Sequence, residues 1–121
     1  MIVEDDEISD MFLKIAVKKI SGDILHAVTG LEAVEIAEKN LDLDLILMDI
    51  KIPEFDGYET TRRIRTFDSE VIIIAQTAHG MADDKEKALE AGCNDYISKP
   101  INQKKLIDML NCHVHQRTAY K

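Results

Sequence analysis

Short apolar runs alternate with longer amphipathic segments along this chain. Five of the runs are too brief for helices and rich in branched residues, which favours β-strands. These runs occupy residues 1–3, 24–28, 45–48, 71–75 and 96–97. The two runs at 45–48 and 71–75 are the most continuously apolar, so we expect them in the centre of a sheet, with 24–28 and 96–97 at its edges.

The segments between these runs carry apolar residues three or four positions apart, as on one face of a helix. The apolar face predicted for the first helix consists of Ile8, Met11, Phe12, Ile15 and Ala16. A capping box of Thr29 and Glu32 predicts a second helix from Leu31 to about Asn40.

Three further helices are predicted in the same way. Tyr58, Thr61 and Ile64 share a face in the third, and the fourth covers 81–91 with Gly92 as its stop. The fifth begins after Asn102 as its cap. Its apolar positions are Leu106, Ile107, Leu110 and Val114.

Alternating strands and helices predict an α/β fold, in which helices cover both faces of an open parallel sheet. The placement of central and edge strands gives the strand order 2-1-3-4-5. A length of 121 residues suits a single domain over 1–121, with 113–121 as a C-terminal tail. His113 and His115 are two residues apart, so they do not share a helical face. With Cys112 they are better explained as a frayed helix end than as a metal site.

Charge and cysteine content narrow the class of function. The formal net charge is −8, which argues against direct binding of nucleic acid or of a membrane surface. No apolar run approaches the length of a membrane-spanning helix, and no signal peptide is visible. Cys93 and Cys112 lack metal-site spacing and are interpreted as free thiols, which favours a cytoplasmic location.

Charged and polar side chains follow the predicted strands at their carboxyl ends, where open parallel sheets place their functional crevice. The first strand ends at Glu4, Asp5 and Asp6, the third at Asp49, the fourth at Thr77 and the fifth near Lys99. Crowded carboxylates repel each other, and a bound Mg²⁺ removes that cost. Lys99 opposite a metal would bind a phosphoryl group, and Asp49 could accept that group covalently.

Four motifs at these strand ends resemble the receiver domain of two-component response regulators. They are VEDD at the first strand, LMDIKIPEFDG around Asp49, QTA at Thr77 and YISKP at Lys99. The resemblance covers essentially the whole chain and implies the flavodoxin-like (βα)5 fold. It also implies that Asp56 and Gly57 form the turn that opens the third helix.

The resemblance implies a role for each matching residue. Asp49 would be the phosphoacceptor, and Thr77 and Tyr96 would be the switch pair. Lys99 would be the lysine that binds the phosphoryl group, and its peptide bond to Pro100 is often cis in such domains. Metal ligands would be Glu4, Asp5, Asp49 and the backbone carbonyl of Lys51, holding Mg²⁺ or in its place Mn²⁺. Asp6 is better explained as part of the first turn of the first helix.

Two positions depart from the family pattern. Only three residues precede Glu4, which predicts a trimmed amino terminus. Lys51 and His79 stand two residues beyond Asp49 and Thr77, at positions that influence phosphoryl lifetime in this family. Read without the resemblance, Thr77 could be an ordinary strand-end hydroxyl, and Tyr96 could serve edge-strand packing alone.

The implied partners are a histidine kinase or histidine phosphotransfer domain, which donates the phosphoryl group, and a downstream protein target. Such a domain catalyses only its own phosphorylation and dephosphorylation. The phrases AQTAH and GYETTRRIR most resemble receivers within hybrid sensor histidine kinases.

The alternatives are a phosphorylation-independent interaction module and an aspartate-nucleophile phosphatase. For the phosphatase, Lys51 stands where the second acid belongs. A flavin-binding domain is disfavoured because no Gly/Ser/Thr-rich phosphate loop follows the first strand.

Overall fold

The computed structural model describes residues 1–18, 24–77 and 84–119. In these ranges five parallel strands form one sheet in the order β2-β1-β3-β4-β5, which confirms the predicted order. The strands are β1 (Ile2–Val3), β2 (His26–Ala27), β3 (Leu45–Asp49), β4 (Ile72–Thr77) and β5 (Asp95–Ser98). The helices are α1 (Glu7–Lys18), α2 (Gly30–Lys39), α3 (Gly57–Arg65), α4 (Asp84–Ala91) and α5 (Gln103–Ala119).

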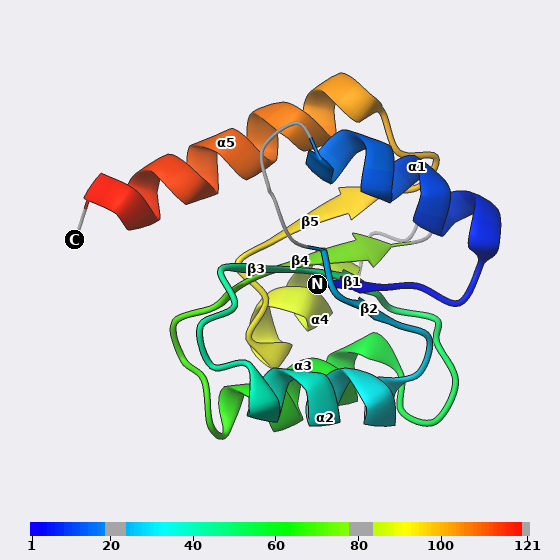
Figure 1. The fold of residues 1–121 in the computed structure, drawn as a ribbon, viewed down its shortest axis with the longest axis vertical. Coiled ribbons are helices and arrows are strands. Elements are labelled where there is room, and N and C mark those ends of the chain that lie inside the picture. The colour runs from blue at the N-terminus through cyan, green and yellow to red at the C-terminus, as the bar shows by residue number, and fades with distance from the viewer. Residues whose placement is uncertain (19–23, 78–83, 120–121) are drawn as a thin grey trace.

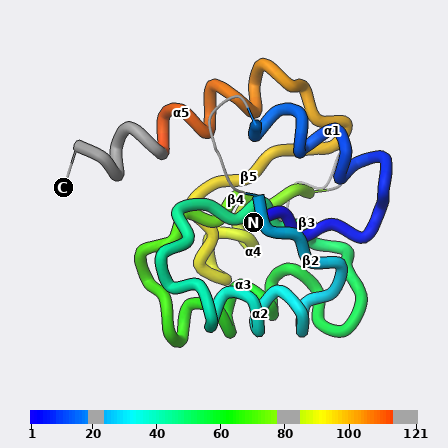
Figure 2. Tube along the Cα trace, viewed as in Figure 1, coloured from blue at the N-terminus to red at the C-terminus, as the bar shows by residue number. Residues whose placement is uncertain are grey.

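Helices cover both faces of the sheet (Figure 1). Helices α1 and α5 lie on one face, and α2, α3 and α4 lie on the other. The trace in Figure 2 shows α1 beside α5 and α2 beside α3, and these pairs are in contact. Each face has its own apolar core, and alternate residues of one strand belong to different cores. Ile73 and Ala75 of β4 pack toward α2, α3 and α4, whereas Ile72 and Ile74 pack toward α1 and α5.

The buried face of α1 differs from the predicted one. The side chains of Ile8, Met11, Phe12 and Ile15 are exposed, from 37% for Phe12 to 79% for Ile8. Of the predicted set only Ala16 is buried, and its buried neighbours on the helix are Asp10, Leu13 and Val17. Helix α1 carries two apolar stripes, and the stripe that contains Leu13 faces the sheet.

Local signals place the other helices close to their predicted positions. The Thr29 hydroxyl oxygen accepts a hydrogen bond from the Glu32 amide at 3.1 Å, which caps α2. The Asp56 carboxylate accepts one from the Glu59 amide at 2.9 Å and caps α3. In α3 the predicted face is buried, and it consists of Tyr58, Thr61 and Ile64.

The fourth helix agrees with expectation over its described residues, and the fifth is longer than expected. Helix α4 covers Asp84–Ala91, and the rest of its predicted range, 81–83, lies outside the described residues. The Asn102 side chain accepts a hydrogen bond from the Lys105 amide at 3.0 Å, as a helix cap does. Helix α5 then continues to Ala119, through most of the range expected as a tail. Cys93 is buried, Cys112 is exposed and both are free thiols. Within the described ranges, no helix has the length and apolar character needed to span a membrane.

Candidate functional site

The site is built on the carboxyl ends of the neighbouring strands β1 and β3. Val3 of β1 pairs with Met48 of β3, so the residues that follow them, Glu4 and Asp49, stand side by side. The Glu4 amide donates to the Ala27 carbonyl of β2 at 3.0 Å, which continues the ladder beyond β1. Neighbouring strands on both sides fix the backbone at Glu4 and Asp49. Because both residues stand at strand ends, their carboxylates lie at the edge of the sheet.

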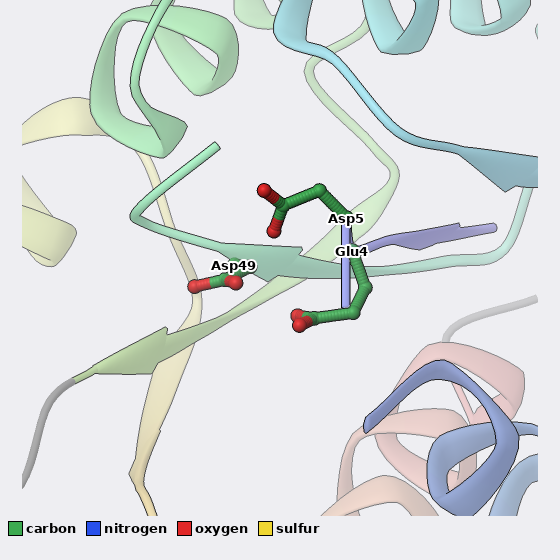
Figure 3. A group of neighbouring side chains, drawn as sticks. All are labelled: Glu4, Asp5 and Asp49. Atoms are coloured by element: carbon green, nitrogen blue, oxygen red, sulfur yellow. The ribbon is translucent and has the colours of Figure 1, made fainter. Parts of the chain in front are cut away.

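Three carboxyl groups form a compact group at this edge. Glu4, Asp5 and Asp49 each offer one oxygen, and these oxygens lie within 4.8 Å of one another (Figure 3). Glu4 and Asp49 are buried, with 1% and 4% of their surfaces exposed, whereas Asp5 is exposed. Figure 3 shows Asp5 and Glu4 leaving the chain in opposite directions, with Asp49 beside them. This is a small oxygen-rich site that is open to solvent through Asp5.

Lys99 brings a positive charge to the same group. Its ammonium nitrogen lies 3.2 Å from Asp49 Oδ2 and 3.8 Å from Glu4 Oε2. The Lys99 amide donates to the Thr77 carbonyl at 2.8 Å, which fixes the chain after β5 against the end of β4. The Lys99-Pro100 peptide bond is cis, as the resemblance implies. Because Lys99 follows β5, its side chain spans the end of β4 to reach Asp49 on β3.

The electrostatics of Glu4 favour a bound cation. Burial is the main cause that raises the pKa of Glu4 from 4.5 to about 8, and the neighbouring Asp49 raises it further. Lys99 opposes this rise without cancelling it. Neither Glu4 oxygen has a hydrogen-bond partner. Hard carboxylate oxygens with open valence and access to water suit Mg²⁺, so the residues present fit this ion.

The loop after β3 holds the Asp49 carboxylate from the other side. The Lys51 amide donates to Asp49 Oδ1 at 3.1 Å, and the Gly57 amide donates to the Ile50 carbonyl at 2.8 Å. A Cβ atom at Gly57 would lie 2.5 Å from the Asp49 carbonyl oxygen, so the start of α3 approaches the strand too closely for any other residue. The role of the Lys51 carbonyl stays a prediction.

The two predicted switch residues lie near the group without joining it. Thr77 is buried at the end of β4, one residue beyond the position that pairs with Asp49. Tyr96 is half-buried in β5 and packs against the core on the side of α2, α3 and α4. The Lys85 ammonium nitrogen lies 5.8 Å from the centroid of its ring. His79 lies outside the described residues.

Asp6 belongs to the start of α1 as expected, but it precedes the first turn and caps the helix. Its carboxylate accepts hydrogen bonds from the Ser9 amide at 2.9 Å and the Ser9 hydroxyl at 2.7 Å, and these bonds lower the pKa of Asp6. His113, at the other end of the chain, lies 3.0 Å from Asp95 and joins α5 to β5.

Sequence reasoning missed two polar side chains within the fold. Asp10 on α1 lies 2.8 Å from the His26 ring of β2 and 2.9 Å from the Lys14 ammonium nitrogen. Gln76 is 1% exposed on β4 and pairs in register with Asp49. The available signal was a glutamine that directly follows the five apolar residues 71–75.

Known proteins with a similar sequence or structure support one family. The chain matches the response regulator receiver domain family over residues 1–111. It is 38% identical over 94% of its length to the hybrid signal transduction histidine kinase I of Dictyostelium discoideum, and it spans 7% of that protein.

Two solved structures are similar in both sequence and fold. One is the receiver domain of the sensor histidine kinase PA1611 from Pseudomonas aeruginosa PAO1, with a magnesium ion coordinated in its active site cleft. It is 33% identical with a TM-score of 0.82, over 94% of each chain. The other is the receiver domain of the Saccharomyces cerevisiae response regulator Ssk1, crystallised with the histidine phosphotransfer protein Ypd1. It is 38% identical with a TM-score of 0.79, over 87% of this chain and 80% of that one. The chain therefore belongs to the response regulator receiver domain family of two-component signalling.

Proposed function

We propose that this receiver domain takes a phosphoryl group onto Asp49 from a phosphohistidine of a partner protein. The observation that carries this proposal is the placement of Asp49 between a cationic and an acidic neighbour. Lys99 lies 3.2 Å from its carboxylate, and Glu4 and Asp5 complete the acidic group. A carboxylate at a fixed strand end, reachable through the exposed Asp5 side, can act as a nucleophile.

The transfer is an exchange of one bond at phosphorus for another. An Asp49 carboxylate oxygen forms the new O–P bond, the N–P bond to the donor histidine breaks, and the imidazole keeps the electron pair and takes a proton from solvent. Mg²⁺, when bound, supplies positive charge to the phosphoryl oxygens. Glu4, Asp5, Asp49 and the Lys51 carbonyl would hold it, and Mn²⁺ would fit the same oxygens. Lys99 supplies the second positive charge on the opposite side.

The phosphoryl group would then change the surface of the domain. The added charge draws Lys99 and the Thr77 hydroxyl toward Asp49, and the half-buried Tyr96 moves inward in response. The surface formed by α4, β5 and α5 is remodelled for a downstream protein target. The Lys85 ammonium over the Tyr96 ring is the contact that this movement would break.

The exposed apolar stripe of α1 supports a partner that docks beside the site. We call it the α1 apolar surface, and its members are Ile8, Met11, Phe12 and Ile15. Helix α1 starts two residues after Asp5, so a protein bound to this stripe would reach Asp49. A shallow pocket at its edge is lined by Met11, Lys14, Ile15, Lys18 and Ile24. Apolar contact flanked by lysines fits a histidine phosphotransfer domain or a histidine-kinase helix pair with acidic side chains.

The parent protein and its location follow from the same proposal. The chain aligns with a small part of a much longer hybrid histidine kinase, so we propose that it acts within or beside such a kinase on the cytoplasmic side. In this role it turns over no separate substrate, and it catalyses only its own phosphorylation and dephosphorylation.

Phosphorylation of an Asp49→Asn variant tests the central assignment. Incubation with acetyl phosphate and Mg²⁺ should label the wild-type protein once and leave the variant unlabelled. Asp42→Asn, at an exposed carboxylate that precedes the start of β3 while the site lies at its end, is the control and should be labelled as the wild type is. Equal labelling of the Asp49→Asn variant would contradict the assignment. Turnover of p-nitrophenyl phosphate would favour the phosphatase alternative, and no structural response to beryllofluoride with Mg²⁺ would favour the phosphorylation-independent module.

A further inference from the structure

Gln76 is a buried amide within an otherwise apolar strand. The side chains of β4 before it belong to the two apolar cores, and alternation along the strand places Gln76 on the face covered by α1 and α5, together with Ile72 and Ile74. Only 1% of Gln76 is exposed. Neither its Nε2 nor its Oε1 has a hydrogen-bond partner. Buried amides without partners are costly and call for an explanation.

The strand register places this amide next to the acidic group. Gln76 is the direct cross-strand neighbour of Asp49, and partners in a parallel pair share a face of the sheet. Glu4 follows β1 on the other side of Asp49, so Glu4, Asp49 and Gln76 form one row across three strands. Both Glu4 oxygens also lack hydrogen-bond partners. Two polar side chains without hydrogen-bond partners, Glu4 and Gln76, therefore stand in the same buried row.

We propose that Gln76 is a positioning residue for the metal site: its side-chain amide binds the Glu4 carboxylate through one buried water on the α1/α5 side of the sheet. Strands β1 and β4 are two strand spacings apart, roughly 10 Å, which two extended side chains and one water can span. A buried water needs two to four polar partners, and the Gln76 amide and Glu4 oxygens supply them. Gln76 thereby fixes the orientation of Glu4 without contacting the phosphoryl group.

This role deepens the proposed function and rests on it. In the unphosphorylated protein Lys99 lies near both Asp49 and Glu4. Phosphorylation would draw Lys99 toward the phosphoryl oxygens, and Glu4 would lose its nearest cation while still required at the metal. Gln76 lies on β4, the strand that the Lys99 side chain crosses. A neutral donor at that place holds Glu4 in the same orientation before and after Lys99 moves.

Substitution by methionine separates a positioning role from simple core packing. Methionine has nearly the size of glutamine and no donor, so Gln76→Met removes the amide and keeps the volume. We expect its dissociation constant for Mg²⁺, measured by calorimetry on the unphosphorylated protein, to rise about tenfold, as for other residues that orient metal ligands. The Mg²⁺ concentration for half-maximal phosphorylation by acetyl phosphate should rise by a similar factor. Ile74→Met is the matched control, because Ile74 is buried on the same face two residues earlier.

Stability measurements complete the test. If Gln76 only fills the core, Gln76→Met should raise the unfolding midpoint and change the Mg²⁺ dissociation constant by less than twofold, and this result would overturn the proposal. Gln76→Leu repeats the test if the methionine variant fails to fold. If the wild type binds Mg²⁺ but takes no label from acetyl phosphate, the proposed function fails while calorimetry still decides the role of Gln76. If the wild type binds no Mg²⁺, the positioning role is refuted.

Discussion

Replacing Glu4 by glutamine should remove the pH dependence of stability that this residue creates. Burial and the nearby Asp49 hold the pKa of Glu4 at about 8 in the folded chain, compared with 4.5 in the unfolded one. The folded state therefore prefers the protonated carboxyl group. The contribution of Glu4 to stability is fully present below about pH 4.5, and it is lost as the pH rises toward about 8. Glutamine keeps the shape and has no charge to lose.

The magnitude follows from the size of the pKa difference. One pKa unit corresponds to about 1.4 kcal/mol, so the rise from 4.5 to about 8 corresponds to at most about 5 kcal/mol. Relaxation of the site and entry of water reduce this, so we expect a loss of a few kcal/mol. That loss is a large fraction of the total unfolding free energy of a domain, which is typically about 5–15 kcal/mol. It is measurable by denaturant unfolding.

The assay compares the free energy of unfolding of the wild type and Glu4→Gln in Mg²⁺-free buffer from pH 5 to pH 8.5. The two proteins should be close in stability at pH 5, and the variant should be more stable by a few kcal/mol at pH 8.5. Saturating Mg²⁺ should stabilise the wild type at pH 8.5 and leave Glu4→Gln nearly unchanged. Glu7→Gln, at an exposed carboxylate, is the control and should follow the wild type. Parallel pH profiles for the wild type and Glu4→Gln would refute the reasoning.

Three further predictions concern α1 and α3. Leu13→Ala should cost about 2–5 kcal/mol of unfolding free energy and Ile15→Ala less than about 0.5 kcal/mol, as measured in urea; the opposite order would contradict the observed face of α1. Ile15→Lys should slow phosphotransfer from a phosphorylated histidine phosphotransfer domain and leave labelling by acetyl phosphate unchanged, whereas equal slowing of both reactions would count against docking on α1. Gly57→Ala should lower the unfolding free energy by about 1–3 kcal/mol, because its Cβ would lie 2.5 Å from the Asp49 carbonyl oxygen. If the variant unfolds at the same temperature as the wild type, the prediction is wrong and the loop moves aside at little cost.

The arrangement of the strands was predictable because it depends on patterns that short segments carry. The apolar runs at 45–48 and 71–75 became the central strands β3 and β4, and the ends of the parallel strands met at one edge. Glu4, Asp49 and Lys99 were brought together by topology alone, without any knowledge of side-chain conformations. The cap at Thr29 was equally visible in the capping box with Glu32, and the family resemblance placed Asp56 at the turn before α3, where it caps that helix.

The buried face of α1 was not predictable from periodicity. The helix has one apolar stripe with Ile8, Phe12 and Ile15 and another with Leu13, Ala16 and Val17, and both have helical spacing. Periodicity measures how apolar a stripe is and not which stripe faces the sheet. The choice depends on tertiary contacts such as that between Asp10 and His26, 16 residues apart in the chain but 2.8 Å apart in space. Prediction therefore selected the more apolar stripe, and the structure exposes it.

The places where folding rules fail have a common explanation in function. An apolar stripe on the surface of α1 gains nothing for the fold and promotes aggregation, so its presence favours a protein that covers it. The unpartnered oxygens of Glu4 and the unpartnered amide of Gln76 are costs to the same fold. On the proposals above, a docked partner would cover the apolar stripe, a cation would satisfy the Glu4 oxygens, and the water shared with Glu4 would satisfy the Gln76 amide. Natural sequences break local rules mainly at functional sites, and here both exceptions lie close to Asp49, the proposed phosphoacceptor.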